Sequence, residues 1–238
     1  MDIRATVQES FEYTRETIWG VWKRWALLAG MSVIFPFILG YVMEIFRGRV
    51  PPPEIENWTK LFIDGLKYIL VMIVYAIPVI IIFAASFMPI IMAVIPQIAA
   101  GNEPDINLPV LLPYMIPMLG GFVLAVLVGI IITFISSIGI IRMARTECVG
   151  EAFNISEILN TIRSIGWINY ILALIVLYVI VGAGSFIVGL ISGIPYIGWL
   201  ISIFLGVPFS LYEARSLTLI YESADANPQS GSPAWIES

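Results

Sequence analysis

Residues 68–98 read YILVMIVYAIPVIIIFAASFMPIIMAVIPQI and contain no charged side chain. At 1.5 Å per residue, a helix over this stretch is longer than the roughly 30 Å of hydrocarbon that a transmembrane helix must cross. A kink or a protruding end must absorb the excess length, and Pro78, Pro89 and Pro96 are the places where such a helix can bend. We therefore predict a membrane span at about residues 66–88.

Three further stretches lack Asp, Glu, Lys and Arg, namely residues 25–43, 106–141 and 164–212. The whole chain of 238 residues is 59% hydrophobic and 12% charged, whereas roughly a quarter of the residues in soluble domains are charged. A water-soluble fold of this size cannot bury so much apolar surface. The sequence predicts an all-α, polytopic helical membrane protein with four to five spanning helices, interfacial amphipathic helices and a possible re-entrant hairpin.

The spans leave too little polar chain for a second, soluble domain, so we expect one helical membrane domain over residues 1–222. Its membrane segments are predicted at about residues 25–46, 66–88, 120–141, 167–190 and 199–217. Pro109, Pro113 and Pro117 interrupt helical hydrogen bonding, so residues 109–117 are expected to form a broken, membrane-dipping approach to the third segment. The tail, residues 223–238, is polar and is expected to be disordered.

Two stretches show the apolar spacing of amphipathic helices. In residues 3–23, apolar side chains recur at intervals of three, four and seven residues, with charged residues between them. This helix either lies along the membrane surface or caps a bundle of its own protein. The second helix begins after Asn154, which with Glu157 resembles a capping box, and leads into the span from Trp167.

All twelve Lys and Arg residues lie outside the connections 97–109 and 191–198. The positive-inside rule therefore places these two loops outside the cell and the C-terminus in the cytoplasm of a multi-pass cell-membrane protein. The run 25–46, with Pro36 and Gly40 near its middle, has two interpretations. It either spans, which puts four basic residues outside, or enters and returns, which keeps all twelve inside and is favoured on charge.

Small residues recur at every fourth position in two of the spans. They are Gly121, Ala125, Gly129, Thr133 and Ser137, and then Gly198, Ser202, Gly206, Ser210 and Ala214. Such stripes let helix backbones approach closely in lipid. They are interpreted as intramolecular helix-packing positions, with contact between subunits or a pore lining as the alternatives.

The charge-free spans exclude several classes of membrane protein. Proton-coupled pumps, voltage sensors, intramembrane proteases and His-ligated haem proteins need ionisable or ligating groups at membrane depth. Cys148 is the single cysteine and there is no histidine, so no internal disulfide and no Cys/His metal site can form. The chain has no basic block that would bind nucleic acid. We expect no catalytic residue, cofactor or metal, and no enzyme.

The charged residues near the membrane boundary are interpreted as contacts with lipid headgroups or with water. Arg142, Arg145, Glu147 and Glu151 form a charged collar at the end of a span, where snorkelling arginines contact lipid headgroups. Headgroup contact is likewise predicted for Lys23 and Arg24. The paired carboxylates Glu54 and Glu56, and Glu103 and Asp105, lie in short proline-containing loops and are expected to be solvated. Six tryptophans near predicted boundaries are interpreted as interfacial anchors: Trp19, Trp22, Trp25, Trp58, Trp167 and Trp199.

Several short motifs together resemble an archaeal multi-pass membrane protein family, the domain of unknown function 4013. They are PFILGY at 36–41, W..LF.DGLK at 58–67, YAIP at 75–78 and RMARTECVGEAFNISE at 142–157. The resemblance covers most of residues 20–220. It implies a membrane protein with an archaeal-type envelope and transfers no activity, ligand or site.

Two functions remain open on the sequence. The leading hypothesis is a non-enzymatic protein that organises or shapes the bilayer, with membrane lipid and further copies of itself as partners. The alternative is a passive channel or an exporter of a small or lipophilic solute, in which broken helices around residues 89–117 line a cavity.

Overall fold

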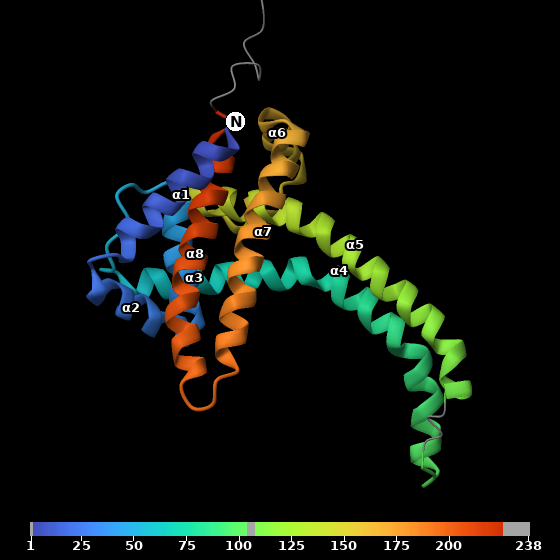
Figure 1. Ribbon diagram of the computed structural model, residues 1–238. Helices are drawn as coiled ribbons and strands as arrows, with labels where there is room; N and C mark the ends of the chain where they lie inside the picture. The colour runs from blue at the N-terminus through green and yellow to red at the C-terminus, as the bar shows by residue number, and fades with distance from the viewer. Residues whose placement is uncertain (1, 104–107, 226–238) are drawn as a thin grey trace, which may run out of the picture. The chain divides into compact units, whose positions relative to one another are not determined.

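The computed structural model describes residues 2–103 and 108–225, and these residues form helices and contain no strand (Figure 1). The α-helices are α1 (Ile3–Ile18), α2 (Trp22–Val33), α3 (Phe35–Phe46), α4 (Trp58–Ala99), α5 (Leu108–Thr146), α6 (Ile155–Ile165), α7 (Trp167–Ser192) and α8 (Gly198–Glu222). A short 3-10 helix, η1 (Val149–Phe153), precedes α6. The predicted all-α class is confirmed. The predicted disordered tail lies outside the described residues from 226 onward.

The chain divides into two compact units. Unit 1 comprises the described residues of Met1–Val71 and Ile135–Ser238, and unit 2 comprises those of Met72–Phe134. Helices α4 and α5 contribute residues to both units. The prediction of a single membrane domain stays a prediction.

Within the described residues, four helices are long and apolar enough to cross a membrane, namely α4, α5, α7 and α8. This confirms the prediction of a polytopic membrane protein with at least four spans. α4 has 42 residues and α5 has 39, so both exceed the predicted segments 66–88 and 120–141. α4 extends beyond the prediction into charged sequence at its start and past Pro89 at its end, and α5 extends from the proline-containing residues before 120 to the arginines at its end.

The prediction of a broken helix at residues 109–117 is wrong. α5 is continuous from Leu108, with Pro113 and Pro117 inside it, and α4 likewise contains three prolines. Each proline removes one backbone hydrogen bond without forbidding helical dihedrals in the residues around it, and membrane helices tolerate this loss.

The run 25–46 is two helices of 12 residues each, α2 and α3, which meet at Ile34. The sequence predicted a bend near Pro36 and Gly40. The break falls just before Pro36 because proline fits the first turn of a helix, where its missing N–H has no intrahelical partner to lose.

α1 packs against α8 through its hydroxyl-bearing face. Ser10, Thr14 and Thr17 are buried, and each hydroxyl donates to the carbonyl four residues earlier at 2.7 to 2.8 Å. The opposite face leaves Phe11 61% exposed. One face of the helix therefore caps the bundle. The alternative, that the helix lies along the membrane surface, stays a prediction.

The Trp25 side chain supplies the hydrogen-bond donor that Pro208 cannot provide within α8. Pro208 cannot donate to the carbonyl of Phe204, four residues earlier in the helix. The Trp25 indole Nε1–H donates to that carbonyl at 2.9 Å, and the Trp25 and Phe204 rings meet edge to face with centroids 6.1 Å apart. A proline inside the last span thus attaches α2 to α8.

Trp25→Phe is expected to lower the free energy of unfolding by about 1–2 kcal/mol, because it keeps a large aromatic ring but leaves the Phe204 carbonyl without its indole donor. In a Pro208→Ala background the new backbone N–H can take that carbonyl, so the same substitution should cost less than half as much. Chemical unfolding in mild detergent, monitored by tryptophan fluorescence, measures both. An equal cost in the two backgrounds would contradict this account.

Candidate functional site

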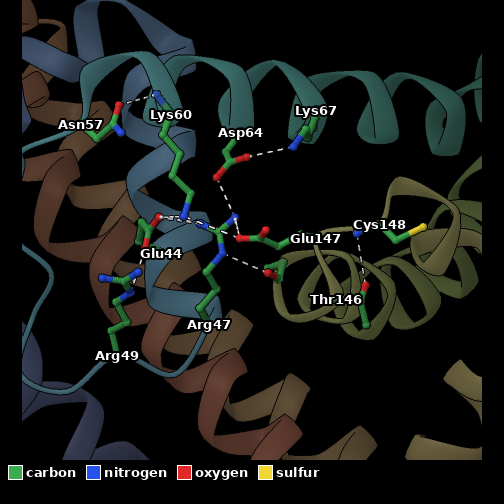
Figure 2. A network of polar contacts seen from close by, with 11 residues as sticks. Glu44, Arg47, Arg49, Asn57, Lys60, Asp64, Lys67, Thr146, Glu147 and Cys148 are labelled. Atoms are coloured by element: carbon green, nitrogen blue, oxygen red, sulfur yellow. Dashed lines mark hydrogen bonds and ion pairs between the residues drawn. The ribbon is translucent and has the colours of Figure 1, made fainter.

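Charged residues from three separate stretches of the chain meet in unit 1. They come from the C-terminal end of α3, the first turns of α4 and the loop that follows α5 (Figure 2). We call this cluster the charged junction, and its members are Glu44, Arg47, Arg49, Lys60, Asp64, Lys67 and Glu147. The sequence analysis placed Glu147 in a boundary collar but did not bring these residues together.

A close crossing of α3 and α4 positions the junction. A Cβ built on Gly40 would lie 1.9 Å from the Leu61 carbonyl oxygen, and one on Gly65 would lie 1.8 Å from the Pro36 carbonyl oxygen. The two helices therefore touch backbone to backbone and run in opposite directions at the crossing. Glycine is needed at both positions because any side chain would occupy the space of the facing backbone.

At the end of this crossing, two arginines cap the C-terminal ends of α3 and α5, each on the helix to which it does not belong. Arg47, which follows α3, donates from Nε to the Ala144 carbonyl near the end of α5 at 3.0 Å. Arg145 donates from Nε to the Phe46 carbonyl, the last of α3, at 3.1 Å. The last carbonyls of a helix have no intrahelical partner and carry partial negative charge. Each cation therefore neutralises the end of the other helix, which ties α3 to α5.

Arg47 also forms ion pairs with two buried carboxylates. Its Nη1 lies 2.6 Å from Glu44 Oε1 and its Nη2 lies 2.7 Å from Asp64 Oδ2. The three side chains are 11%, 8% and 3% exposed, in that order. Charges with so little access to water persist only when they are paired and hydrogen-bonded, so Arg47 is the central cation of the junction.

The outer members of the junction are more exposed. Arg49 Nε and Lys60 Nζ lie 2.8 and 3.3 Å from the Glu44 carboxylate, and Lys67 Nζ lies 3.2 Å from Asp64. The Glu147 carboxylate stands 3.6 Å from Lys60. Four cations thus face three carboxylates, which leaves one positive charge in excess.

Beside the junction, Gly48 makes room for a further ion pair. Arg145 Nη2 lies 2.6 Å from Glu222 Oε1, and its guanidinium stacks over the Tyr221 ring at 4.8 Å. A Cβ on Gly48 would lie 2.8 Å from that Glu222 oxygen, and Gly48 has φ +80°. Both the positive φ and the lack of space for a Cβ favour glycine at this position. The Arg145–Glu222 ion pair beside it attaches α8 to the ends of α3 and α5.

A family model described as "Protein of unknown function (DUF4013)" matches residues 26–196. The chain belongs to this family. The family resemblance inferred from the short motifs is therefore confirmed, and the matched range covers most of residues 20–220, as expected. No curated protein and no solved structure matches the chain.

The DUF4013 region contains every member of the charged junction and the α3–α4 crossing. The motif PFILGY supplies Pro36 and Gly40 of that crossing, and the motif beginning at Trp58 supplies Leu61 and Gly65. α8, with Glu222, follows the matched range. These two motifs thus lie side by side in the folded chain.

A second polar cluster in the DUF4013 region surrounds Glu151. Arg142 Nη2 lies 2.5 Å from Glu151 Oε2, and the Asn154 side-chain amide donates to the same carboxylate at 3.3 Å. Asn154 also caps α6, as the sequence predicted, by accepting from the Glu157 N–H. Hydrogen bonds from Arg142 first and Asn154 second lower the pKa of the Glu151 carboxyl below its ordinary value of 4.5.

A group with a lowered pKa stabilises the fold above its unfolded pKa and ceases to do so as the pH falls through its folded pKa. We therefore expect Glu151→Gln to lower the thermal unfolding midpoint at pH 6–7, and the difference from the parent protein to vanish well below pH 4.5. Unfolding scans of both proteins across this range test the sign. A difference that grows toward acid pH would contradict it.

The predicted small-residue stripe of α5 faces α4 in unit 2. A Cβ on Gly121 would lie 1.7 Å from Ser86 Oγ, and one on Gly129 would lie 4.0 Å from Val79. Ala125 between them is buried, and the Thr133 hydroxyl donates to its own helix at the Gly129 carbonyl. Ser137, the last member, belongs to unit 1 and lies 3.5 Å from the Tyr178 hydroxyl.

The second stripe lies on α8, outside the DUF4013 region, and two of its members approach α7. A Cβ on Gly198 would lie 2.4 Å from the Ile191 carbonyl, and Ser202 Oγ lies 3.4 Å from the Val188 carbonyl. Ser210 donates within α8, Ala214 is buried, and Gly206 has open space where a Cβ would point. The prediction of contact between subunits stays a prediction.

The four residues predicted to contact lipid headgroups fall into two pairs. Lys23 is exposed and Arg24 is half-buried. Arg142 and Arg145 direct their guanidinium groups at Glu151 and Glu222 of their own chain. A headgroup could therefore contact only the N–H groups that these ion pairs do not use. Of the carboxylate pairs, Glu54, Glu56 and Glu103 are exposed, and Asp105 lies outside the described residues.

Sequence reasoning also missed a buried arginine in α8. Arg215 is 5% exposed, forms an ion pair with Glu9 of α1 and lies over the Tyr13 ring at 5.2 Å. Its position after a long charge-free run was the available signal, because an arginine near lipid needs a partner. The pair explains how α1 is attached to α8.

Proposed function

We propose that this protein is a non-enzymatic membrane protein that shapes the bilayer by inserting a helical hairpin into one leaflet. The length of the hairpin carries the proposal. α2 and α3 have 12 residues each, or about 18 Å at 1.5 Å per residue, against a hydrocarbon thickness of about 30 Å. Val33, Ile34 and Phe35 at their joint are 67%, 54% and 60% exposed, so an apolar tip is available to lipid.

The polar ends of the hairpin support the same placement. α3 ends at the charged junction through Arg47. At the start of α2, Lys23 and Arg24 line a hollow of about 250 Å³ together with Glu54 and Glu56. Charged groups at both ends and apolar groups at the tip favour a segment that enters and leaves on one side.

Aromatic side chains next to the hairpin add to the area that one leaflet must accommodate. Trp19 and Trp22 are 72% and 63% exposed, and the rings of Trp22 and Trp25 stack with centroids 5.4 Å apart. Indole rings favour the headgroup level of a bilayer. A row of them beside a half-depth hairpin would expand one leaflet relative to the other and so favour curvature.

Reconstitution into liposomes tests this function. The parent protein is expected to convert vesicles of about 200 nm into smaller vesicles or tubules, scored by electron cryomicroscopy and light scattering. The variant Val33→Ser, Ile34→Ser, Phe35→Ser should insert but lose this effect. A matched control, Ile194→Ser, Tyr196→Ser, Ile197→Ser, removes three exposed apolar side chains from the α7–α8 turn and should retain it. Unchanged vesicles with the parent protein would refute the proposal.

We further propose that both termini face the cytoplasm of the cell membrane and that loops 97–109 and 191–198 face outward. Four spans and a returning hairpin support this orientation, because it keeps every basic residue on one side. In a Cys148→Ser background, cysteines at Glu12, Glu54 and Glu103, all exposed, can be labelled in intact cells with an impermeant reagent. Labelling of Glu103→Cys alone is expected, and labelling of Glu12→Cys would contradict the hairpin.

Self-association belongs to the same proposal. Gly182 and Gly189 of α7, seven residues apart on one face, have open space where a Cβ would point, which would let another helix approach closely. Crosslinking in lipid should give discrete oligomers that Gly182→Leu, Gly189→Leu weakens. A monomer in lipid would contradict this part.

One observation favours the alternative, a passive channel or exporter of a lipophilic solute. Unit 2 contains a hollow of about 760 Å³ lined by apolar side chains of α4 and α5, among them Phe83, Phe87, Met115 and Phe122. Its size and lining suit a lipophilic molecule. Release of an entrapped lipophilic dye from proteoliposomes, abolished by Gly121→Leu or Met115→Trp, would promote this function.

A further inference from the structure

A polar hollow of about 400 Å³ opens on the α4 side of the charged junction. Its lining includes Ile63 of α4. It also includes Asn57, Lys60, Asp64 and Lys67 of the α4 region and Glu147 from the loop after α5, which are labelled in Figure 2. Residues 60, 63, 64 and 67 have the spacing of a single helix face. The two lysines therefore project toward the same space.

The charge of the hollow suits an anion. Arg47 pairs with both buried carboxylates, Glu44 and Asp64, and Lys60 and Lys67, each more than a third exposed, approach the same two carboxylates at 3.3 and 3.2 Å. With Arg49 on Glu44, the four cations of the junction exceed its three carboxylates by one charge, and the two lysines are the cations that line the hollow. The start of α4 at Trp58 adds the positive end of a helix dipole. A single negative charge placed between the lysines would balance the cluster.

Glu147 occupies the position that such an anion would take. It has φ +57°, a conformation that residues with a Cβ rarely adopt, and its side chain is 62% exposed. Its carboxylate stands 3.6 Å from both Lys60 Nζ and Arg47 Nη2, beyond the length of a direct hydrogen bond. An incoming anion can displace this loosely held carboxylate.

The hollow lies where polar sequence gives way to a membrane span. Lys67 is the last charged residue before Glu103, and Trp58, an expected interfacial anchor, is 42% exposed. Ile63, Leu66 and Leu70 of the same helix are 47%, 45% and 55% exposed. An anionic headgroup and an apolar chain therefore find their partners along one helix.

We propose that this hollow binds the phosphodiester headgroup of a membrane phospholipid. Lys60 and Lys67 contact the phosphate oxygens, and an acyl chain runs along Ile63, Leu66 and Leu70. Charge-assisted hydrogen bonds from two ammonium groups to a phosphate are strong enough to hold one lipid in place. The site is independent of the bilayer-shaping function, since it requires neither the hairpin tip nor curvature.

Titration calorimetry of the full-length protein in an uncharged detergent tests the site with three probes. They are short-chain phosphatidylglycerol, glycerol phosphate without acyl chains, and a short-chain diacylglycerol without phosphate. The intact lipid is expected to bind at least about tenfold more tightly than either fragment, because only it uses both the lysines and the apolar face. Equally tight binding of glycerol phosphate or inorganic phosphate would overturn the lipid assignment in favour of a free anion.

Variants with opposite expected signs separate binding from folding. Lys60→Gln and Lys67→Gln should each weaken lipid binding about fivefold to tenfold. Glu147→Gln removes the competing carboxylate and should tighten binding by a similar factor, which damage to the fold cannot do. Arg163→Gln, an exposed basic residue on α6, carries the same charge change and should leave binding unaltered. No change in the lysine variants, or weaker binding in Glu147→Gln, would refute the site.

Discussion

Arg47→Met is expected to lower the free energy of unfolding by about 3–5 kcal/mol, the cost of removing one partner from a buried ion pair. The substitution keeps an unbranched side chain of similar length. It leaves the carboxylates of Glu44 and Asp64, 8% and 3% exposed, without the least exposed cation of the junction, which pairs with both. It also uncovers the Ala144 carbonyl at the end of α5, so α3, α4 and α5 lose a common contact.

Arg49→Met is the matched control, because it makes the same chemical change two residues away at a side chain that is 55% exposed. An ion pair so accessible to water is worth about 1 kcal/mol or less. Urea unfolding in mild detergent, monitored by tryptophan fluorescence, compares the two. Glu44→Gln with Asp64→Asn in the Arg47→Met background should recover a large part of the loss, since it removes the stranded charges. Equal losses from the two arginine variants would contradict a buried junction.

The membrane spans could be predicted from the sequence because a long run without charged residues is favourably solvated only by the hydrocarbon of the bilayer. The helix ends could not, because charged residues at a boundary are compatible with either helix or loop. α4 begins at Trp58 and includes Lys60, Asp64 and Lys67, whereas the predicted span began only at about residue 66. Their spacing along one helix face was the available signal that they form a cluster.

The contacts between distant residues, such as those of the charged junction, could not be predicted from local sequence patterns. Arg47 and the Ala144 carbonyl are 97 residues apart in the chain, and Trp25 and the Phe204 carbonyl are 179 apart. Both contacts satisfy backbone carbonyls that a helix end or a proline leaves free, and a free carbonyl does not specify which distant side chain will reach it. Pro208 leaves the Phe204 carbonyl in need of a donor, and only the fold shows that Trp25 supplies it.

The spacing of small residues predicted the close contact made by α5, whereas the close crossing of α3 and α4 was not predicted. The stripe of α5 was visible because it repeats over several turns. The crossing of α3 and α4 rests on one glycine in each helix, Gly40 and Gly65, and a single glycine in an apolar run carries no periodic signal. Each glycine is recognisable once the facing carbonyls of Leu61 and Pro36 are known.

Gly65→Ala and Gly40→Ala are each expected to lower the free energy of unfolding by about 3 kcal/mol, the upper part of the range for overpacking. The added methyl group would lie 1.8 Å from the Pro36 carbonyl oxygen in the first variant and 1.9 Å from that of Leu61 in the second. Both neighbours are backbone atoms and cannot rotate away, so the helices must separate. Gly30→Ala in α2, where a Cβ meets nothing within 4 Å, should instead be neutral or stabilise by up to about 1 kcal/mol.

The crossing and the charged junction should also prove energetically coupled. Asp64 precedes Gly65 directly, so any displacement of α4 at Gly65 moves the Asp64 carboxylate away from Arg47, which it meets at 2.7 Å. Gly65→Ala should therefore weaken the ion pair that Arg47→Met removes, and the double variant should lose at least about 1 kcal/mol less than the sum of the two single losses. Gly65→Ala and Gly40→Ala, which open the same crossing, should be subadditive for the same reason. Strict additivity in the first cycle would show that the junction holds its geometry without the close contact between α3 and α4.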